Sequence, residues 1–205
     1  MLGSVTKIRN KLTSTEIEKR ISNGGSVSVV MQRKGATKQS IANMPLPEGY
    51  FVRRVNEDDY EGVVDTLKVL TTVGRVSKEQ FASVVQYWDS VKLHNCSQGG
   101  GTGLKYNPLV IVETVTGEVA ATGNIIIEQK LIHDCGLVGH VEDISVSEKH
   151  QGKKLGKCLI EQLTEIGMEN GCYKIILDCD PKNIKFYEKC GYNEAGVEMN
   201  IRANL

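Results

Sequence analysis

The sequence lacks any apolar run that approaches the roughly 20 residues needed to span a bilayer, which argues against stable membrane insertion. It also lacks net charge, because 25 basic residues balance 25 acidic ones, and no overall field favours nucleic acid or an acidic partner. None of its six cysteines forms a C-x-x-C motif, and Cys158, Cys172 and Cys179 lie in apolar runs. This usage favours a reducing compartment, predicted to be the cytoplasm, over a disulfide framework.

The length of 205 residues suits one domain with a tail. Residues 1–44 are rich in Ser, Thr, Gly and basic residues and contain no aromatic residue. We expect them to form a basic, disordered N-terminal extension, with an organelle transit peptide as the minor alternative. Pro45 and Pro47 close this segment, so the folded domain is predicted over residues 45–205.

Strand and helix patterns alternate along this domain. Strands are predicted at residues 50–55, 137–147 and 172–180. Residues 108–128 are predicted to form two strands joined by a turn at 116–117, and residues 197–203 a final, half-buried strand. Helices are predicted at residues 57–73, 77–88, 155–170 and 181–190. Strands interleaved with helices predict a three-layer α/β domain, and the hairpin within 108–128 makes its sheet mixed.

The stretch HQGKKLGKCLIEQL, from His150 to Leu163, joins a predicted strand to a predicted helix. The first backbone N–H groups of a helix have no partner inside it, and the helix dipole favours negative charge there. Three lysines, Lys153, Lys154 and Lys157, add positive charge. A phosphate site and an ordinary solvated turn are both open on this ground, although the spacing matches neither a P-loop nor a dinucleotide fingerprint.

Two segments resemble the signatures of the GNAT acetyltransferase superfamily. QGKKLG resembles its Q/R-x-x-G-x-G/A motif, and NIKFYEKCGY resembles its short helix with an asparagine ahead and a tyrosine within. Over about residues 46–203 the chain is similar to the eukaryotic glucosamine 6-phosphate N-acetyltransferases, in TLKVLTTVG, AATGNIII, GHVEDISV, GCYKIILDCD, FYEKCGY and AGVEMNIR. This resemblance implies the GNAT fold, with a mixed, mostly antiparallel central sheet and helices on both faces.

The resemblance implies acetyl transfer from acetyl-CoA to D-glucosamine 6-phosphate by direct attack in a ternary complex, without a metal, on the route to UDP-N-acetylglucosamine. It implies that the coenzyme is bound by Ile144, Ser145, Val146, Gln151, Gly152, Lys153, Lys154, Leu155, Gly156, Lys157, Asn183 and Tyr187. The family usually has glycine at the position of Lys154. A lysine would be strained there if the position requires a positive φ.

More than one role is open for each of the candidate catalytic residues. The resemblance puts the hydroxyl of Tyr187 near the coenzyme sulfur, where it would protonate or hydrogen-bond the thiolate; the alternative is a buried tyrosine whose hydroxyl makes a structural hydrogen bond. Asp178 follows an apolar strand and is a candidate general base if burial raises its pKa. Its alternative role is a cap for the helix that follows. Asp143, a backbone carbonyl and water are the competing candidates for the base. Glu142 and Asp143 can share one substrate only if a bulge breaks the strand alternation, and the resemblance implies one, with the N–H near Ile144 polarising the thioester carbonyl.

For the sugar phosphate, the resemblance implies contacts from Thr71, Lys130, Leu131, Ile132, His133, Glu142, Asp143, Tyr173, Lys174 and Arg202. Arg202 would be lent across a homodimer interface, so that two chains share each active site. The alternative for these cations is an ordinary solvated surface. Two other functions stay open, namely a GNAT enzyme for a different amine and a non-catalytic acyl-CoA-binding module.

Overall fold

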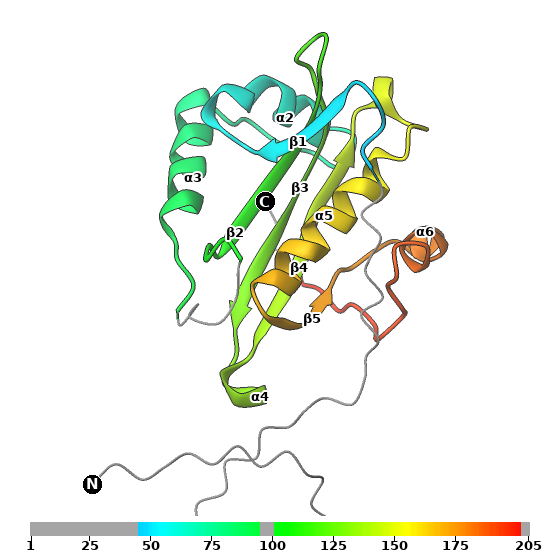
Figure 1. Ribbon diagram of the computed structural model, residues 1–205. Coiled ribbons are helices and arrows are strands. Elements are labelled where there is room, and N and C mark those ends of the chain that lie inside the picture. The colour runs from blue at the N-terminus through cyan, green and yellow to red at the C-terminus, as the bar shows by residue number, and fades with distance from the viewer. Residues whose placement is uncertain (1–44, 95–100, 202–205) are drawn as a thin grey trace, which may run out of the picture. The chain divides into compact units, whose positions relative to one another are not determined.

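The structure is a computed structural model that describes residues 45–94 and 101–201. The predicted extension over residues 1–44 and the predicted ligand Arg202 therefore lie outside the described residues. The described part contains a five-stranded sheet in the order β1-β2-β3-β4-β5 (Figure 1). The strands are β1 (Tyr50–Arg54), β2 (Tyr106–Glu113), β3 (Val119–Gln129), β4 (Leu137–Val146) and β5 (Cys172–Ile176). Neighbours from β1 to β4 are antiparallel and β5 runs parallel to β4, which confirms the predicted mixed sheet.

Helices cover both faces of the sheet, which gives the three predicted layers (Figure 1). On one face, α5 (Leu155–Glu169) packs Leu155, Leu159 and Leu163 against the sheet, as its periodicity predicts. On the other face, α2 (Tyr60–Leu67) and α3 (Lys78–Ser90) pack against Val110 and Val112 of β2. Because β2 is buried on both sides, residues 109–112 in its second half form a continuous apolar run rather than an alternating pattern.

Capping groups set several helix ends. Ser77 caps α3 by accepting the N–H of Gln80 at 3.2 Å, and the Gln80 side chain accepts the N–H of Ser77 at 2.8 Å. Gly171, at φ +87°, ends α5 as the predicted left-handed cap. The helix predicted over 57–73 is shorter than expected, because it divides into η1 (Glu57–Asp59) and α2, which ends at Leu67.

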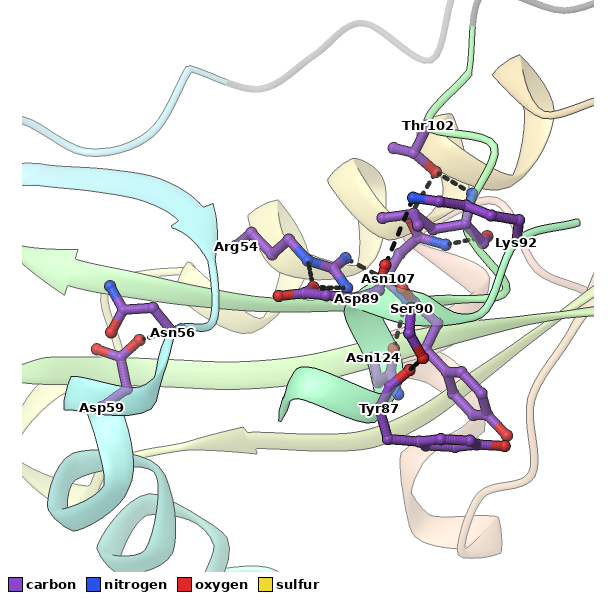
Figure 2. A network of polar contacts seen from close by, with 12 residues as sticks. Arg54, Asn56, Asp59, Tyr87, Asp89, Ser90, Lys92, Thr102, Asn107 and Asn124 are labelled. Carbon is purple, nitrogen blue, oxygen red and sulfur yellow. Dashed lines mark hydrogen bonds and ion pairs between the residues drawn. The ribbon is translucent and has the colours of Figure 1, made fainter. Parts of the chain in front are cut away.

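Polar contacts attach the α2–α3 layer to the edge of the sheet (Figure 2). Asp59 is buried and accepts the N–H of Asn56 at 2.8 Å, which fixes the turn between β1 and η1. Arg54 on β1 pairs with Asp89 on α3 at 2.6 Å, and its guanidinium also donates to the carbonyl of Tyr106 on β2 at 3.0 Å. These contacts join the first strand to both its neighbouring strand and its covering helix.

The half-buried strand predicted over residues 197–203 is wrong for this single chain. Residues 193–201 have no regular secondary structure, and residues 202 and 203 lie outside the described part. Val197, Met199 and Ile201 are 90%, 93% and 98% exposed, although they show the expected alternation. A period of two identifies a sequence suited to a strand but does not supply the neighbouring strand that would bury it.

Two smaller elements flank the part of the sheet where the predicted site lies. The first is η2 (Glu148–His150), between β4 and α5. The second consists of η3 (Pro181–Asn183) and α6 (Ile184–Glu188), after β5. Among the helices in the described ranges, none has the length and apolar character needed to cross a membrane.

Candidate active site

The connection from β4 to α5 adopts a conformation that leaves the start of α5 open. Gly152 and Lys154 have φ values of +77° and +63°, and Lys154 is the N-cap of the helix. The first helical hydrogen bond runs from the N–H of Cys158 to the carbonyl of Lys154 at 3.2 Å. The N–H groups of the three residues between them therefore have no helical partner and suit an anion.

This conformation decides the question raised by the lysine at position 154. The position does have a positive φ, so the usual glycine fits it and a lysine carries strain. The cost for an L-residue in this region is about 1–2 kcal/mol. The Lys154 side chain is exposed, and Lys154 still lines the cavity beside α5.

A cavity of about 630 Å³ lies at this junction, within the range of small-molecule sites. Every residue predicted to bind the coenzyme lines it except Lys153. They come from the end of β4, from the junction and first turn of α5, and from η3 and α6: Ile144, Ser145, Val146, Gln151, Gly152, Lys154, Leu155, Gly156, Lys157, Asn183 and Tyr187. The structure thus gathers a set that the sequence holds in three separate segments.

Lys153 points elsewhere because its ammonium group donates to the hydroxyl of Tyr50 at 2.5 Å. This hydrogen bond raises the pKa of Lys153 above its usual value. The Tyr50 hydroxyl in turn lies 2.9 Å from Nδ1 of buried His150, whose Nε2 faces a carboxylate oxygen of Glu118 at 3.5 Å. The contact between Tyr50 and His150 ties the loop to β1, and the facing of His150 and Glu118 brings the loop beside the β2–β3 turn.

A bulge interrupts β4 beside the cavity, as the resemblance implies. Thr122 of β3 pairs with Ser145 and Asn124 pairs with Glu142, so Gly123 faces two residues of β4. One of these two, Asp143, has φ +55°, a region that non-glycine residues rarely occupy. The bulge takes Glu142 and Asp143 out of strict alternation, and both side chains are exposed.

The end of β4 is also attached to α2. Buried Ser145 donates its hydroxyl to the carbonyl of Thr66 at 2.6 Å. Thr66 lies in the last turn of α2, and the chain that follows brings Val69 and Leu70 to the cavity wall. These two apolar side chains are 41% and 50% exposed, which is consistent with a wall that a ligand would cover.

Tyr187 reaches the cavity from α6. It is half-buried, and this burial raises the pKa of its phenol, with smaller contributions from Cys179 and Cys190. Its ring contacts Phe186 and Tyr192, but within the described ranges its hydroxyl makes no hydrogen bond. A structural tyrosine would have its hydroxyl satisfied, so this free, protonated hydroxyl favours an interaction with a ligand.

Three carboxylates lie near one another beside the bulge. Partial burial raises the pKa of Glu142 above its usual range, and Asp143 and Asp178 raise it further. Asp178 itself is exposed, because β5 ends at Ile176, so the burial on which its role as a base was predicted is absent. The cap of η3 is Asp180, which accepts the N–H of Lys182 at 2.9 Å, so the capping alternative for Asp178 is also wrong.

Those predicted sugar-phosphate ligands that the structure describes do not line the cavity. His133 stacks on Tyr173 with ring centroids 4.2 Å apart, and Lys174 lies over the same Tyr173 ring at 5.9 Å. Lys130 is paired with Glu128 at 2.5 Å. This cluster lies at the end of the β3–β4 hairpin beside α4 (Ile132–Cys135), a turn in which residues 133–135 are left-handed (Figure 1). Leu131 and Ile132 are exposed in the same turn, and Thr71 is exposed just after Leu70.

Four cavity residues are not among those predicted from the sequence: Val69, Leu70, His150 and Phe186. The sequence predicts Val69 and Leu70 within a helix, and only the early end of α2 exposes them. Phe186 neighbours Tyr187, and His150 precedes Gln151, so both adjoin motif residues that were recognised. In the described part of the chain, no three His, Cys, Asp or Glu side chains gather as metal ligands.

Comparison with known proteins gives concordant likenesses. The model of the acetyltransferase (GNAT) family matches residues 80–192. Glucosamine 6-phosphate N-acetyltransferase of Candida albicans is 49% identical over 160 residues, which cover 78% of this chain and 99% of that protein. The Arabidopsis thaliana protein of the same name is 34% identical over 156 residues, covering 76% and 97%.

Solved structures agree with the sequence relatives. The crystal structure of glucosamine-6-phosphate N-acetyltransferase from Arabidopsis thaliana superposes with a TM-score of 0.67 at 33% identity, covering 76% of this chain and 99% of that one. A Trypanosoma brucei acetyltransferase gives a TM-score of 0.65 at 27% identity, covering 75% and 99%. These likenesses confirm the predicted GNAT fold.

The strain at position 154 gives a testable prediction. We expect Lys154→Gly to raise the free energy of unfolding by about 0.5–1 kcal/mol, because relief of the left-handed conformation outweighs the added entropy of the unfolded chain. Urea unfolding measures the change. The matched control is Lys157→Gly, three residues into the same junction but helical, which should lower stability by about 1 kcal/mol. Equal losses in both variants would show that Lys154 is unstrained.

Proposed function

We propose that this chain, which belongs to the acetyltransferase (GNAT) family and within it to the glucosamine 6-phosphate N-acetyltransferases, transfers acetyl from acetyl-CoA to D-glucosamine 6-phosphate. The products are N-acetyl-D-glucosamine 6-phosphate and CoA, on the route to UDP-N-acetylglucosamine. One observation carries the proposal: the open start of α5, Ile144 of the bulge and Tyr187 of α6 line the same cavity. A cytoplasmic location is part of the proposal, supported by the free thiols of the described cysteines.

The residues at the start of α5 fit the pyrophosphate of acetyl-CoA. The N–H groups without helical partners and the helix dipole attract an anion although they carry no formal charge. Lys154 and Lys157 add positive charge at the edge of this site. Gly156 leaves space open in the cavity, since a Cβ there would stand in ordinary contact with two cavity residues, 3.4 Å from Val146 and 3.6 Å from Phe186. Lys153 contributes indirectly, because its bond to Tyr50 restrains the loop that carries these groups.

Bound acetyl-CoA supplies an activated thioester. The bulge takes Ile144 out of residue-for-residue pairing with β3, and we propose that its backbone N–H donates to the thioester carbonyl oxygen as negative charge develops there. Tyr187 donates its hydroxyl hydrogen toward the departing sulfur. Because burial raises the phenol's pKa, and an ordinary thiol has a pKa of about 8.5, Tyr187 stabilises the thiolate by hydrogen bonding rather than by giving up its proton completely.

The amine must be neutral before it attacks, so the site needs a proton acceptor. Glu142, Asp143 and Asp178 provide a group of carboxylates beside the bulge. Glu142 and Asp178 are both exposed, so exposure does not distinguish them. The raised pKa of Glu142 brings its carboxylate nearer to that of an effective base at neutral pH, which supports Glu142 as the base. Asp143, a backbone carbonyl and water stay as competing bases.

The position of the predicted phosphate ligands supports a homodimer. Leu137, beside the Lys130–His133 turn, and Asp143 lie six residues apart on β4, about 20 Å along a strand. One chain therefore cannot place this cationic cluster in its own cavity. A second copy can bring its Lys130, His133 and Lys174 to the cavity, and the alternating Val197, Met199 and Ile201 offer an unpaired segment to hold it. Arg202 continues that segment and is proposed to bind the phosphate.

A dimer interface at the C-terminal segment predicts a change in assembly. Wild-type protein should sediment at about twice 22.6 kDa, and Met199→Asp with Ile201→Asp should shift it to the monomer and abolish turnover, because charges replace the apolar stripe. Val115→Asp, at a residue 90% exposed on the β2–β3 turn, is the matched control and should remain dimeric. A wild-type monomer at micromolar concentration would contradict the shared site.

The substrate assignment predicts a clear order among acceptors. With acetyl-CoA and full-length protein, free thiol release should be fastest with glucosamine 6-phosphate, because the proposed cationic cluster recognises its phosphate. Glucosamine should be slower by at least about 100-fold, the value of one or two charged hydrogen bonds, and a lysine peptide should be inactive. Preference for another amine would redirect the proposal within the family, and binding without turnover would indicate an acyl-CoA-binding module.

Tyr187→Phe tests the role of the free hydroxyl. We expect kcat to fall about 100-fold with little change in the KM for acetyl-CoA, because the lost contact strengthens as thiolate charge develops. Steady-state kinetics separates the two constants. Tyr192→Phe, which removes the hydrogen bond to Thr164 at 2.7 Å outside the cavity lining, is the control and should change stability but not kcat. A large rise in KM at normal kcat would argue against the assigned role.

A further inference from the structure

Gly123 lies at the point of β3 where the sheet register changes. Its neighbours Thr122 and Asn124 pair with Ser145 and Glu142, so the bulge residues Asp143 and Ile144 lie opposite Gly123 alone. Gly123 does not have a positive φ and needs no glycine for its own backbone conformation. Glycine in the interior of a strand weakens it, so a different reason must account for this residue.

The reason is the space that a side chain at position 123 would occupy. A Cβ there would lie 2.5 Å from Cδ1 of Ile144, and 3.1 Å and 3.2 Å from the tips of Leu159 and Leu163 on α5. The Ile144 side chain therefore lies across Gly123 and packs against the core beneath α5. In this place Ile144 supplies the apolar contact that residue 123 would otherwise make.

This packing attaches the bulge to the rigid part of the fold. Ile144 belongs both to the cavity lining and to the packing against α5, whereas its neighbour Asp143 is exposed and strained. A methyl group on residue 123 must displace the tip of Ile144, and the tips of Leu159 and Leu163 crowd the same position. The proposal requires that this crowding passes part of the displacement to the backbone of residues 143 and 144. The N–H of Ile144, which is proposed to donate to the thioester carbonyl, would move with that backbone.

We propose that Gly123 is a positioning residue for acetyl transfer, acting through the Ile144 side chain to hold the backbone N–H of the bulge at the thioester carbonyl. The inference rests on the proposed function. The absence of a side chain at Gly123 would then affect the rate of acetyl transfer and not only the stability of the fold. Gly123 touches neither the cavity nor, in this proposal, either substrate.

The decisive experiment compares the kcat of a variant that introduces the clash with the kcat of a double variant that removes it. Gly123→Ala should lower kcat by about 10- to 100-fold, as expected for a catalytic group displaced by a fraction of an ångström to 1 Å, with the KM for acetyl-CoA nearly unchanged. Adding Ile144→Val removes Cδ1, the atom in closest conflict, and should recover most of the lost kcat. A double variant as slow as Gly123→Ala would overturn the proposal.

Gly167→Ala is the matched control. A Cβ at Gly167 of α5 would lie 2.7 Å from Cδ1 of Ile175 and 2.8 Å from Cδ1 of Ile125, a conflict of similar size outside the cavity lining. It should lower the melting temperature while kcat stays within about twofold of wild type. If Gly167→Ala lowers kcat as much as Gly123→Ala, the effect of Gly123 is only structural and the proposal fails.

Two further measurements separate this inference from the proposed function. If Gly123→Ala does not fold, the double variant is compared with Ile144→Val alone, and a kcat more than 10-fold lower would contradict the proposal. If wild type itself shows no turnover, the proposed function fails, and a crystal structure of Gly123→Ala decides the inference. An Asp143 φ still near +55° would overturn it, and a displaced bulge that returns in the double variant would support it.

Discussion

The start of α5 is the constraint on which the rest of the site depends, because a helix can offer its first N–H groups only if nothing in the chain covers them. The junction from β4 meets this condition by turning through two positive φ values at Gly152 and Lys154. Leu155, the first residue of α5, anchors this end of the helix, because its side chain is only 1% exposed and packs in the core between α5 and the sheet. The open end is therefore a rigid feature that burial of the next residue holds in place.

Two non-glycine residues, Asp143 and Lys154, adopt left-handed conformations on either side of the cavity. Left-handed conformations are costly for L-residues, and such strain is typically concentrated where function requires an unusual backbone. At Asp143 the left-handed conformation accompanies the bulge that takes residues 143 and 144 out of register with β3, and at Lys154 it accompanies the open first turn of α5. The buried packing of Ile144 and Leu155, one residue after each strained position, explains how the fold sustains both.

Local sequence signals predicted the elements whose stabilising contacts are also local. Ser77 with Gln80, and Gly171 after α5, gave correct helix ends because capping depends on neighbours a few positions away. The cavity could be predicted as far as its residues belong to recognisable segments. The direction of Lys153 could not be, because its partner Tyr50 lies 103 positions earlier, and neither could the approach of Val69 and Leu70, which depends on Ser145 bonding to α2. Asp178 was misjudged because strand length, and with it burial, is set by pairing with β4.

Residues 197–201 show a different limit of prediction from sequence. Their alternation is that of a half-buried strand, yet in the single chain they form no strand. Alternation at Val197, Met199 and Ile201 is costly to leave in water, and no strand at the described edge of the sheet buries it. The cationic turn at residues 130–133 presents the same difficulty in another form, because β4 separates it from the cavity of its own chain. The proposed second copy would answer both at once, because it would cover the apolar stripe and bring the cations to a cavity. A homodimer is therefore the assembly that these two features together favour.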